Sequence, residues 1–165
     1  MKVSDLMNAS VITIAPEESA ALAARLISRH NVGSLPVCGG DGRLRGIVTD
    51  RDIVLRCVAP EEDPAQTPVR DIMTRNCAVA SPEDDPAEAA RLMAESQVRR
   101  LPVTREGKLV GMLSLADLAR AEQFNMETAR ALSEISDNIR PPKRHTKPVI
   151  PKSRAENAAR QCREA

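Results

Sequence analysis

The chain is built around an internal repeat. Shifted by 66 residues, positions 3–37 align with positions 69–103, and 14 of the 35 aligned positions are identical. The shared strings include Ala24-Arg25-Leu26 with Ala90-Arg91-Leu92, and Leu35-Pro36-Val37 with Leu101-Pro102-Val103. After a deletion of one residue the register continues and places Gly46 over Gly111, Thr49 over Ser114 and Asp52 over Asp117. Two copies of one supersecondary unit of about fifty residues therefore constrain the fold.

The first half of each copy predicts a strand followed by a helix. Residues 11–14 and 77–80 are the predicted strands. The first helix begins after Ser19; in the second copy Asp85 is the capping residue, Pro86 opens the helix and Glu88 is expected to bond back to the cap. The apolar stripes at helical spacing are Ala23, Leu26 and Ile27, and Ala89, Leu92 and Met93.

The second half of each copy predicts a hairpin and another helix. The hairpins join 35–37 to 44–48 around a Gly-rich turn at 39–42, and 101–103 to 109–113 around Glu106-Gly107. Helices are predicted at 50–58 and 115–123. Each copy is thus a β-α-β-β-α unit. One unit alone would leave an apolar sheet face uncovered, so we expect an α+β fold in which the two repeats pack through their sheets.

The remaining segments connect or follow the repeats. Residues 1–59 and 69–122 are the predicted repeats, and residues 60–68 form an acidic, proline-containing linker. Residues 127–138 predict an amphipathic helix with Ala131, Leu132 and Ile135 on its apolar side. Residues 140–165 hold eight Lys and Arg against two Asp and Glu, and four prolines, which predicts a basic disordered tail.

Composition excludes several classes of protein. The four cysteines form no C-x-x-C pair and do not cluster with His30 or His145, so neither a zinc site nor a disulfide framework is predicted. No apolar stretch approaches the ~18–20 residues of a membrane span, and the N-terminus lacks the apolar core of a signal peptide. We therefore expect a protein of the reducing cytoplasm. Phe124 is the only aromatic residue, so a bound base would have to lie between aliphatic groups.

Several of these strings resemble a known family. Val3-Ser4-Asp5-Leu6-Met7, Leu35-Pro36-Val37 and the run from Gly46 to Ile53, with their second copies, closely resemble a tandem CBS domain pair, or Bateman module, of the stand-alone bacterial type. The resemblance covers residues 1–122. It implies pseudo-twofold symmetry, two clefts between the sheets that accept AMP, ADP, ATP or S-adenosylmethionine, and a homodimer in which four repeats form a disc. It also implies regulation of a separate partner protein.

The two strand-to-helix junctions are the leading site candidates. Thr49-x-x-Asp52 and Ser114-x-x-Asp117 each place a carboxylate where it can accept hydrogen bonds from both ribose hydroxyls, each worth ~1.5–3 kcal/mol. The resemblance assigns this role to Asp52 and Asp117. The hydroxyl and the first helical N–H groups would face a phosphate. The alternative is that Thr49 and Ser114 only cap their helices, with the Asp residues complementing the helix dipole.

Other candidates would hold the phosphate and the base. The family often places basic residues where Arg99 and Arg100 stand, whereas the first copy has Gly33-Ser34, so we expect unequal clefts with phosphate contacts from Arg99, Arg100 and Arg51. The alternative for the Arg99-Arg100 pair is a solvated strand edge that discourages aggregation. The candidate walls for the base, each with a plain core position as its alternative, are Thr13, Ile14, Val32, Pro36, Val79, Ala80, Val98 and Pro102.

Three functional hypotheses follow from these residues. No nucleophile with a base, catalytic carboxylate pair or Gly-rich phosphate loop is visible, so neither enzymatic activity nor a covalently bound cofactor is expected. The leading hypothesis is a sensor in which an adenine nucleotide shifts the relative angle of the repeats. The second is a dimeric interaction module without a ligand. The third is association of the tail with nucleic acid or another anionic surface through phosphate contacts alone, against a solvated tail without function.

Overall fold

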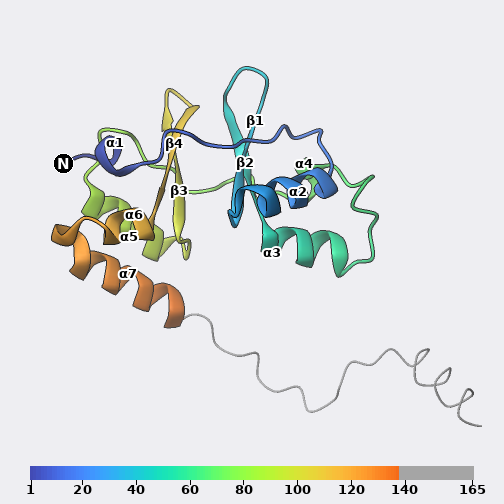
Figure 1. Cartoon of the computed structure of the whole chain (residues 1–165). Helices are drawn as coiled ribbons and strands as arrows, with labels where there is room; N and C mark the ends of the chain where they lie inside the picture. Colours follow the sequence, from blue (N-terminus) through green and yellow to red (C-terminus); the bar gives the residue numbers. More distant parts are fainter. Residues whose placement is uncertain (138–165) are drawn as a thin grey trace, which may run out of the picture.

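The computed structural model describes residues 1–137, which form two similar halves (Figure 1). The elements are α1 (Val3–Leu6), α2 (Ala20–His30), β1 (Ser34–Cys38), β2 (Leu44–Thr49), α3 (Asp50–Ile53), η1 (Val54–Val58), α4 (Val69–Ile72), α5 (Pro86–Glu95), β3 (Arg100–Arg105), β4 (Lys108–Ser114), α6 (Leu115–Ala119), η2 (Glu122–Phe124) and α7 (Asn125–Asp137). The α+β class is confirmed, because each half combines a two-stranded antiparallel sheet with helices. The predicted tail, with His145 and Cys162, lies outside the described residues.

The two hairpins follow the predicted pattern. The fully buried cross-strand pairs are Leu35 with Val48 and Leu101 with Leu113. In the second hairpin Glu106 and Gly107 have positive φ angles of 52° and 78°, the conformation that a two-residue turn between twisted strands requires. A register shift occurs at the same place in both hairpins, between Val37 and Cys38 and between Val103 and Thr104. The two sheets are therefore built to one plan.

The predicted strands at 11–14 and 77–80 are wrong in extent. Each is reduced to a single parallel bridge, from Ile14 to Val37 and from Ala80 to Val103. The Ile14 N–H donates to the Pro36 carbonyl at 3.1 Å, and the Ile14 carbonyl accepts from the Cys38 N–H at 3.0 Å. The next pair of bonds in a parallel ladder would need an N–H at position 36, which proline lacks. Position 102 is also proline and ends the second ladder in the same way.

The second helix of each half is less regular than predicted. In place of one helix over 50–58, α3 is followed by the π-helix η1, and 115–123 is divided between α6 and the 3₁₀ helix η2. The cap of α5 also differs in one detail. Asp85 accepts from the Ala87 N–H at 2.8 Å and Pro86 opens the helix, but the Glu88 side chain pairs with Arg91, one turn further on, rather than with the cap.

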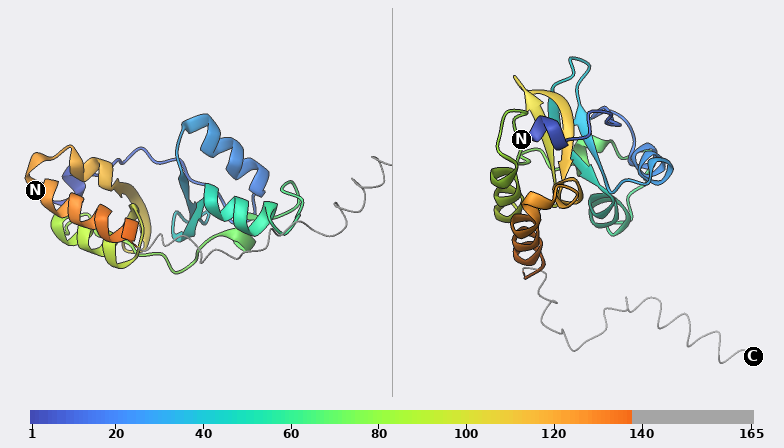
Figure 2. Two further views of the ribbon diagram at one scale, coloured as in Figure 1. Left: turned by 90° about the horizontal axis from the view of Figure 1, so that it is seen from below. Right: turned by 60° about the vertical axis from the view of Figure 1, so that its left-hand side comes forward.

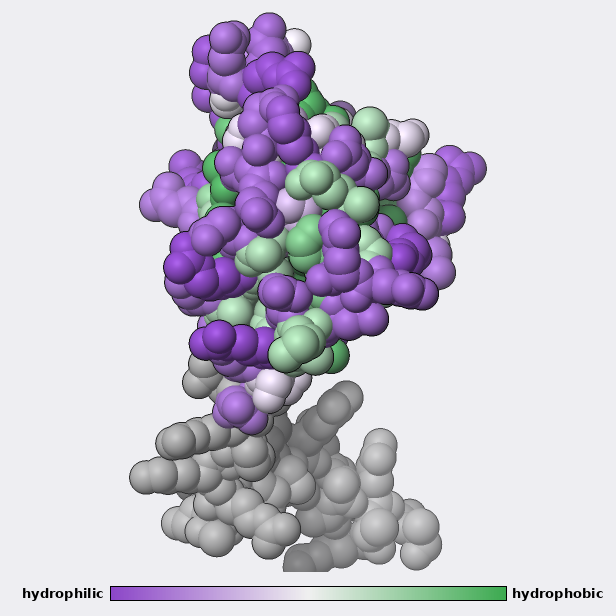
Figure 3. All heavy atoms as spheres, turned by 90° about the vertical axis from the view of Figure 1, so that its left-hand side faces the viewer, coloured by the Kyte–Doolittle hydropathy of each residue, from purple (hydrophilic) through white to green (hydrophobic). Residues whose placement is uncertain are grey.

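Helix α7 covers the second half, packing along α5 and α6 (Figure 1). It begins two residues before the predicted start and buries Thr128, Ala131 and Ile135. Leu132, predicted on the apolar side, is 48% exposed, because the line through Ala131 and Ile135 faces α5 and the next residue points about 100° away. Figure 3 views this end of the molecule, where apolar residues gather centrally within a polar border.

Each half completes its core with a short helix from the start of the other repeat. Val3 of α1 is fully buried in the core of the second half, and its N–H donates to the Asp84 carbonyl at 3.0 Å. Val69 and Ile72 of α4 are buried in the core of the first half, where the Val69 N–H donates to the Glu18 carbonyl at 2.7 Å. The two repeats in sequence therefore exchange their leading segments in the fold.

The two sheets lie in the middle of the molecule and the helices lie outside them (Figures 1 and 2). The hairpin loops of the two halves meet reciprocally. The Leu44 N–H donates to the Gly107 carbonyl at 3.0 Å, and the Leu109 N–H donates to the Gly42 carbonyl at 3.2 Å. Because these residues are equivalent in the two copies, the contact has the expected pseudo-twofold character. Among the helices of residues 1–137, none has the length and apolar character needed to cross a membrane.

Candidate functional site

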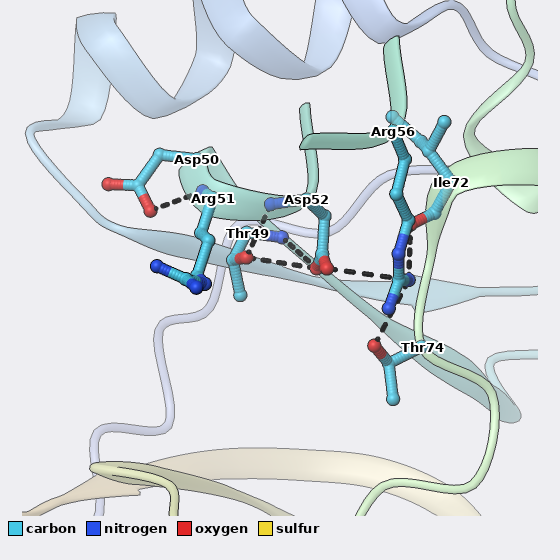
Figure 4. Close-up of polar contacts among 7 residues, drawn as sticks. All are labelled: Thr49, Asp50, Arg51, Asp52, Arg56, Ile72 and Thr74. Atoms are coloured by element: carbon cyan, nitrogen blue, oxygen red, sulfur yellow. Dashed lines mark hydrogen bonds and ion pairs between the residues drawn. The ribbon is translucent and has the colours of Figure 1, made fainter. Parts of the chain in front are cut away.

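Strand β2 places Thr49 at the start of α3, where Thr49 and Asp52 cap the helix reciprocally (Figure 4). The Asp52 N–H donates to Thr49 Oγ1 at 3.0 Å, and Asp52 Oδ2 accepts from the Thr49 N–H and hydroxyl, both at 2.9 Å. The helix cap by Thr49, given in the sequence analysis as the alternative to a ligand-binding role, is thus present. The second carboxylate oxygen, Oδ1, stays outside the cap and has Arg56 Nη1 3.4 Å away, while the Asp52 side chain is only 13% exposed.

The second junction repeats this geometry. Asp117 Oδ2 accepts from the Ser114 N–H at 2.9 Å and from its hydroxyl at 2.6 Å. Asp117 Oδ1 accepts from Arg120 Nη1 at 2.7 Å, although the Arg120 side chain is 77% exposed. In both junctions one carboxylate oxygen is committed to the helix cap and the other faces a cation. The side chains are therefore held in place before any ligand arrives.

Arg56 makes the first junction different from the second. Its Nη1 donates to the Ile72 carbonyl at 2.8 Å and lies 3.4 Å from Thr74 Oγ1, so one guanidinium connects Asp52 to the end of α4 and to the segment after it (Figure 4). The equivalent position in the second copy is Ala121. Arg51 extends away from this cluster in Figure 4 and takes no part in it.

The glycine that precedes each junction is required by close approach of the exchanged segments. A Cβ on Gly46 would lie 2.4 Å from the carbonyl oxygen of Thr74. On Gly111 it would lie 2.5 Å from the Met7 sulfur and 3.1 Å from the Asn8 carbonyl oxygen. Backbone bridges form at the same places, between Ile47 and Thr74 and between Asn8 and Met112. The glycines of the Gly-x-x-Thr and Gly-x-x-Ser strings, Gly46 and Gly111, thus mark the positions where one repeat contacts the other.

Two clefts of matching construction lie between the halves. Cleft A has a volume of about 450 Å³ and is lined from residues 9–15, 38–42 and 109–111. Cleft B has a volume of about 610 Å³ and is lined from residues 75–79 and 44–46, with Ser96, Thr104 and Gly107. The repeat alignment places 9–13 over 75–79 and 44–46 over 109–111. Each cleft is therefore walled by both repeats, so a ligand in either one would contact both.

Each cleft contains one cysteine. Cys38 lines cleft A and Cys77 lines cleft B. Burial raises the pKa of both thiols, in Cys38 with a smaller contribution from the Asp41 charge. Both side chains are therefore neutral thiols at pH 7 and act as small apolar wall residues. Among residues 1–137, no group of three or more His, Cys, Asp and Glu side chains is arranged to hold a metal ion.

The predicted wall residues are divided among clefts, core and surface. Thr13 and Ile14 line cleft A, and Val79 lines cleft B. The remaining five line neither cleft: Pro36, Ala80 and Pro102 are buried, Val98 packs against the second core, and Val32 is exposed. The core alternative fits four of the eight positions: Pro36, Ala80, Val98 and Pro102.

The junction residues lie at the other ends of the strands that line the clefts. Strands β2 and β4 enter the clefts at residues 44–46 and 109–111 and end at the two junctions, so Thr49, Arg51, Asp52, Ser114 and Asp117 line neither cleft. Arg99 is exposed and also lines neither. The clefts and the junctions thus lie at opposite ends of β2 and β4.

Arg100 reaches from the second repeat to the first junction. Its Nη1 lies 3.4 Å from the position of a Cβ on Gly33, and Asp50 Oδ2 lies 3.7 Å from the same position. Because the first copy has Gly33 where the second has Arg99, there is room for this guanidinium. The predicted basic residue therefore sits beside the opposite repeat's junction, as a contact across the two halves would require.

Two functional candidates escaped the sequence reasoning. Arg45 and Arg75 both line cleft B, but neither belongs to a motif. The alignment of the two copies contained the signal, since Arg45 aligns with Val110 and Arg75 with Ala9, both of which line cleft A. A comparison of the two copies by charge, rather than by identity, would have found them.

Comparisons with known proteins agree with the repeat and the fold. A family model described as CBS domain matches residues 3–59 and 69–123. The CBS domain-containing protein YhcV of Bacillus subtilis is 40% identical over 134 residues, which is 81% of this chain and 94% of that protein. Hypoxic response protein 1 of Mycobacterium tuberculosis is 38% identical over 116 residues, 70% of this chain and 81% of that protein.

Solved structures give the same result. A crystal structure of hypoxic response protein I with two coordinated zinc ions has a TM-score of 0.68 at 36% identity, covering 73% of this chain and 98% of that one. The CBS domain pair of protein MJ0100, in complex with 5′-methylthioadenosine and S-adenosylmethionine, has a TM-score of 0.67 at 26% identity, covering 76% of this chain and 98% of that one. With its two matched repeats, the chain belongs to the CBS domain family as a tandem CBS pair.

Proposed function

We propose that this protein is a regulatory module that binds an adenosine-containing ligand between its two repeats and acts on a separate partner protein. The observation that carries the proposal is the construction of the clefts, because each is walled by residues of both repeats. A related CBS pair is known in complex with 5′-methylthioadenosine and S-adenosylmethionine, which supports an adenosyl ligand here.

In this proposal the junction carboxylates bind the ribose. Asp52 and Asp117 each keep one carboxylate oxygen outside the helix cap. That oxygen can accept hydrogen bonds from the ribose hydroxyls once the neighbouring arginine, Arg56 or Arg120, moves away. A hydrogen bond to a charged acceptor contributes ~1.5–3 kcal/mol, which offsets the loss of an exposed ion pair such as that between Arg120 and Asp117. Thr49 and Ser114 hold the carboxylates in position through their caps.

The remaining ligand groups would be held from both repeats. At the first junction Arg100 is a candidate phosphate contact, as are Arg99 and Arg51, which stand next in sequence to Arg100 and Asp50. Thr13, Ile14 and Val79 supply aliphatic surface for the base in the clefts. Since the chain has only one aromatic residue, such aliphatic surface is what it offers in place of stacking.

A ligand that contacts both repeats can change their position relative to each other. The halves touch through reciprocal backbone bonds at the hairpin loops, so a ligand between the sheets favours the arrangement in which both walls contact it. The effect on a partner follows from the surface that this arrangement presents. The proposed action is therefore binding and population shift rather than catalysis.

Isothermal titration of the full chain with AMP, ATP, S-adenosylmethionine and 5′-methylthioadenosine tests the proposal. We expect binding of at least one of them, weakened about ten-fold in Asp52→Asn or Asp117→Asn. Asn keeps the size of the side chain but lacks the charge, and circular dichroism checks that both variants fold. Absence of heat with all four ligands at millimolar concentration would overturn the proposal.

A second candidate is a dimeric interaction module that needs no ligand. The observation that favours it is a stripe on η1, where Val54, Leu55 and Val58 are 54%, 51% and 55% exposed. These three residues lie at i, i+1 and i+4 on one side of the helix, and a soluble surface rarely exposes such a group without a partner. The equivalent residues of the second repeat are Ala119, Arg120 and Gln123.

The two candidates make different predictions for one variant. Leu55→Glu places a charge in the stripe, and the interaction module requires that it lower the molar mass measured by light scattering from dimer to monomer. Ligand titration on the same variant separates the candidates, because the sensor proposal requires adenosyl binding to persist. Arg120→Glu in the second repeat is the matched control, expected to leave the mass unchanged.

A further inference from the structure

The two clefts differ in charge at equivalent positions. Arg45 and Arg75 line cleft B, whereas the described lining of cleft A contains no charged residue. The residues of cleft A aligned with these arginines are Val110 and Ala9. One framework therefore occurs twice in the same chain, with two arginines in the lining of one copy and two small apolar residues in the other.

The positive charge of cleft B is only partly compensated. Although Arg45 is part of the cleft B lining, its guanidinium lies beside Gly39 of cleft A and pairs with Asp41 at 3.1 Å, so it adds no net charge to cleft B. Arg75 donates from Nη2 to the Arg70 carbonyl at 3.1 Å, and within residues 1–137 it forms no ion pair with a carboxylate. Arg43 adds to the same side, because its Nη1 lies 2.9 Å from the position of a Cβ on Gly107, which lines cleft B. A net positive charge remains at this cleft.

We propose that cleft B selects a ligand that carries phosphate groups and that cleft A selects an uncharged adenosyl ligand. This inference rests on the proposed function and assigns different ligand classes to its two clefts. A guanidinium at a partly enclosed cleft attracts phosphates and donates two parallel hydrogen bonds to them. Cleft A offers backbone and aliphatic groups, and the Arg45 guanidinium beside its Gly39 is already paired with Asp41, so a phosphate entering it would lose hydration without gaining an unpaired cation.

The assignment differs from the expectation drawn from sequence. From the sequence, the two clefts were expected to differ in charge because of Arg99 and Arg100. In the structure these two residues line neither cleft. Arg100 stands at the first junction, and the charge difference between the clefts comes from Arg75, with Arg43 beside Gly107. Arg75 is the decisive residue, because its charge is uncompensated and its counterpart is alanine.

The test uses three probes of graded chemistry: ATP, 5′-methylthioadenosine and inorganic tripolyphosphate. They are titrated against the ¹⁵N-labelled full chain, with the amides of Cys77 and Val79 reporting on cleft B and those of Val11 and Thr13 on cleft A. We expect ATP and tripolyphosphate to shift the cleft B amides, and 5′-methylthioadenosine to shift the cleft A amides. ATP affinity should fall with added salt, whereas that of the uncharged ligand should not.

Variants at equivalent positions sharpen the test. Arg75→Ala should weaken ATP and tripolyphosphate binding about ten-fold and leave 5′-methylthioadenosine unchanged, and Arg75→Lys should recover part of the loss. Ala9→Arg should give cleft A the ability to bind ATP. Arg91→Ala, on the exposed side of α5 and outside both clefts, is the matched control and should change nothing.

The outcomes separate the inference from the function on which it rests. If ATP binds the native chain and Arg75→Ala and Ala9→Arg both leave its affinity and its shifted amides unchanged, the charge assignment is wrong and the proposed function stands. If tripolyphosphate shifts the cleft B amides in an Arg75-dependent manner but no adenosyl ligand binds, the anion selectivity stands and the adenosyl function falls. If no probe binds at all, the inference is overturned, and the proposed function falls with it when AMP and S-adenosylmethionine also give no heat.

Discussion

The carbonyl oxygen of Thr74 lies 2.4 Å from where a Cβ on Gly46 would stand. Real Cβ atoms do not come this close to a carbonyl, so only glycine allows the segment after α4 to pair with β2. That pairing, through Ile47 and Thr74, is one of the contacts by which the second repeat's leading segment is joined to the first repeat. The exchange of leading segments thus depends on one missing side chain in each strand.

Gly46→Ala is expected to destabilise the protein more than Gly111→Ala. At position 46 the obstacle is backbone and the cost is about 2–3 kcal/mol, whereas at 111 the nearest atom is the sulfur of the flexible Met7 side chain and the cost is about 1 kcal/mol. Urea denaturation followed by circular dichroism measures both free energies of unfolding. Equal losses in the two variants would contradict this account of the glycines.

Arg56→Ala is expected to lower the free energy of unfolding by about 1–2 kcal/mol, since it removes a charged donor from the Ile72 carbonyl and from Asp52. Arg120→Ala is the matched control at the second junction. Its side chain is largely exposed and, among the described residues, forms an ion pair with Asp117 alone, so its effect should stay within about 0.5 kcal/mol. An Arg56→Ala protein as stable as the control would show that the tie contributes nothing.

Much of the fold could be predicted because the information is local. The repeat fixed the number of units, Ser19 and Asp85 signalled their helices as caps, and the turn residues located the hairpins. The strands at 11–14 and 77–80 could not be judged in the same way. Their length depends on which strand they would join and on whether that strand offers donors, and Pro36 and Pro102 withhold them.

The exchange of α1 and α4 between the halves also escaped prediction. The apolar residues of these helices, such as Val3 and Val69, indicate burial but do not identify which of two nearly identical cores receives them. The same distinction between local and long-range features applies to the candidate site. Capping at Thr49 and Ser114 is a local property and was foreseen as an alternative, whereas the clefts, with Arg45 and Arg75, exist only when both repeats are in place.

Two neighbouring substitutions in α7 test how this helix is attached. Ile135→Ala should cost about 2–3 kcal/mol, because Ile135 is 8% exposed and belongs to the core of the second half. Leu132→Ala, at a position 48% exposed, should change stability by about 0.5 kcal/mol or less. Thermal denaturation of both variants measures the difference, and a larger loss at position 132 would mean that α7 packs with a different face.

The cleft cysteines provide a probe that depends on pH. Burial raises the pKa of Cys38 and Cys77, so at pH 7 each has less thiolate than in the unfolded chain, and its alkylation by iodoacetamide should be slower. The rate should rise toward that of the unfolded chain only at a pH above the usual range for cysteine. Peptide mapping by mass spectrometry separates the two sites from Cys57 and Cys162. Alkylation at pH 7 as fast as in urea would contradict the burial.

The central claim is that one ligand is held by both repeats at once. A ¹⁵N chemical-shift titration of the full chain with ATP tests it most directly. The account predicts that amides from the two walls of cleft B, Val79 in the second repeat and Arg45 in the first, shift together with the same dissociation constant. Shifts confined to residues of a single repeat, or none with ATP or with any of the other three adenosyl ligands at millimolar concentration, would contradict it.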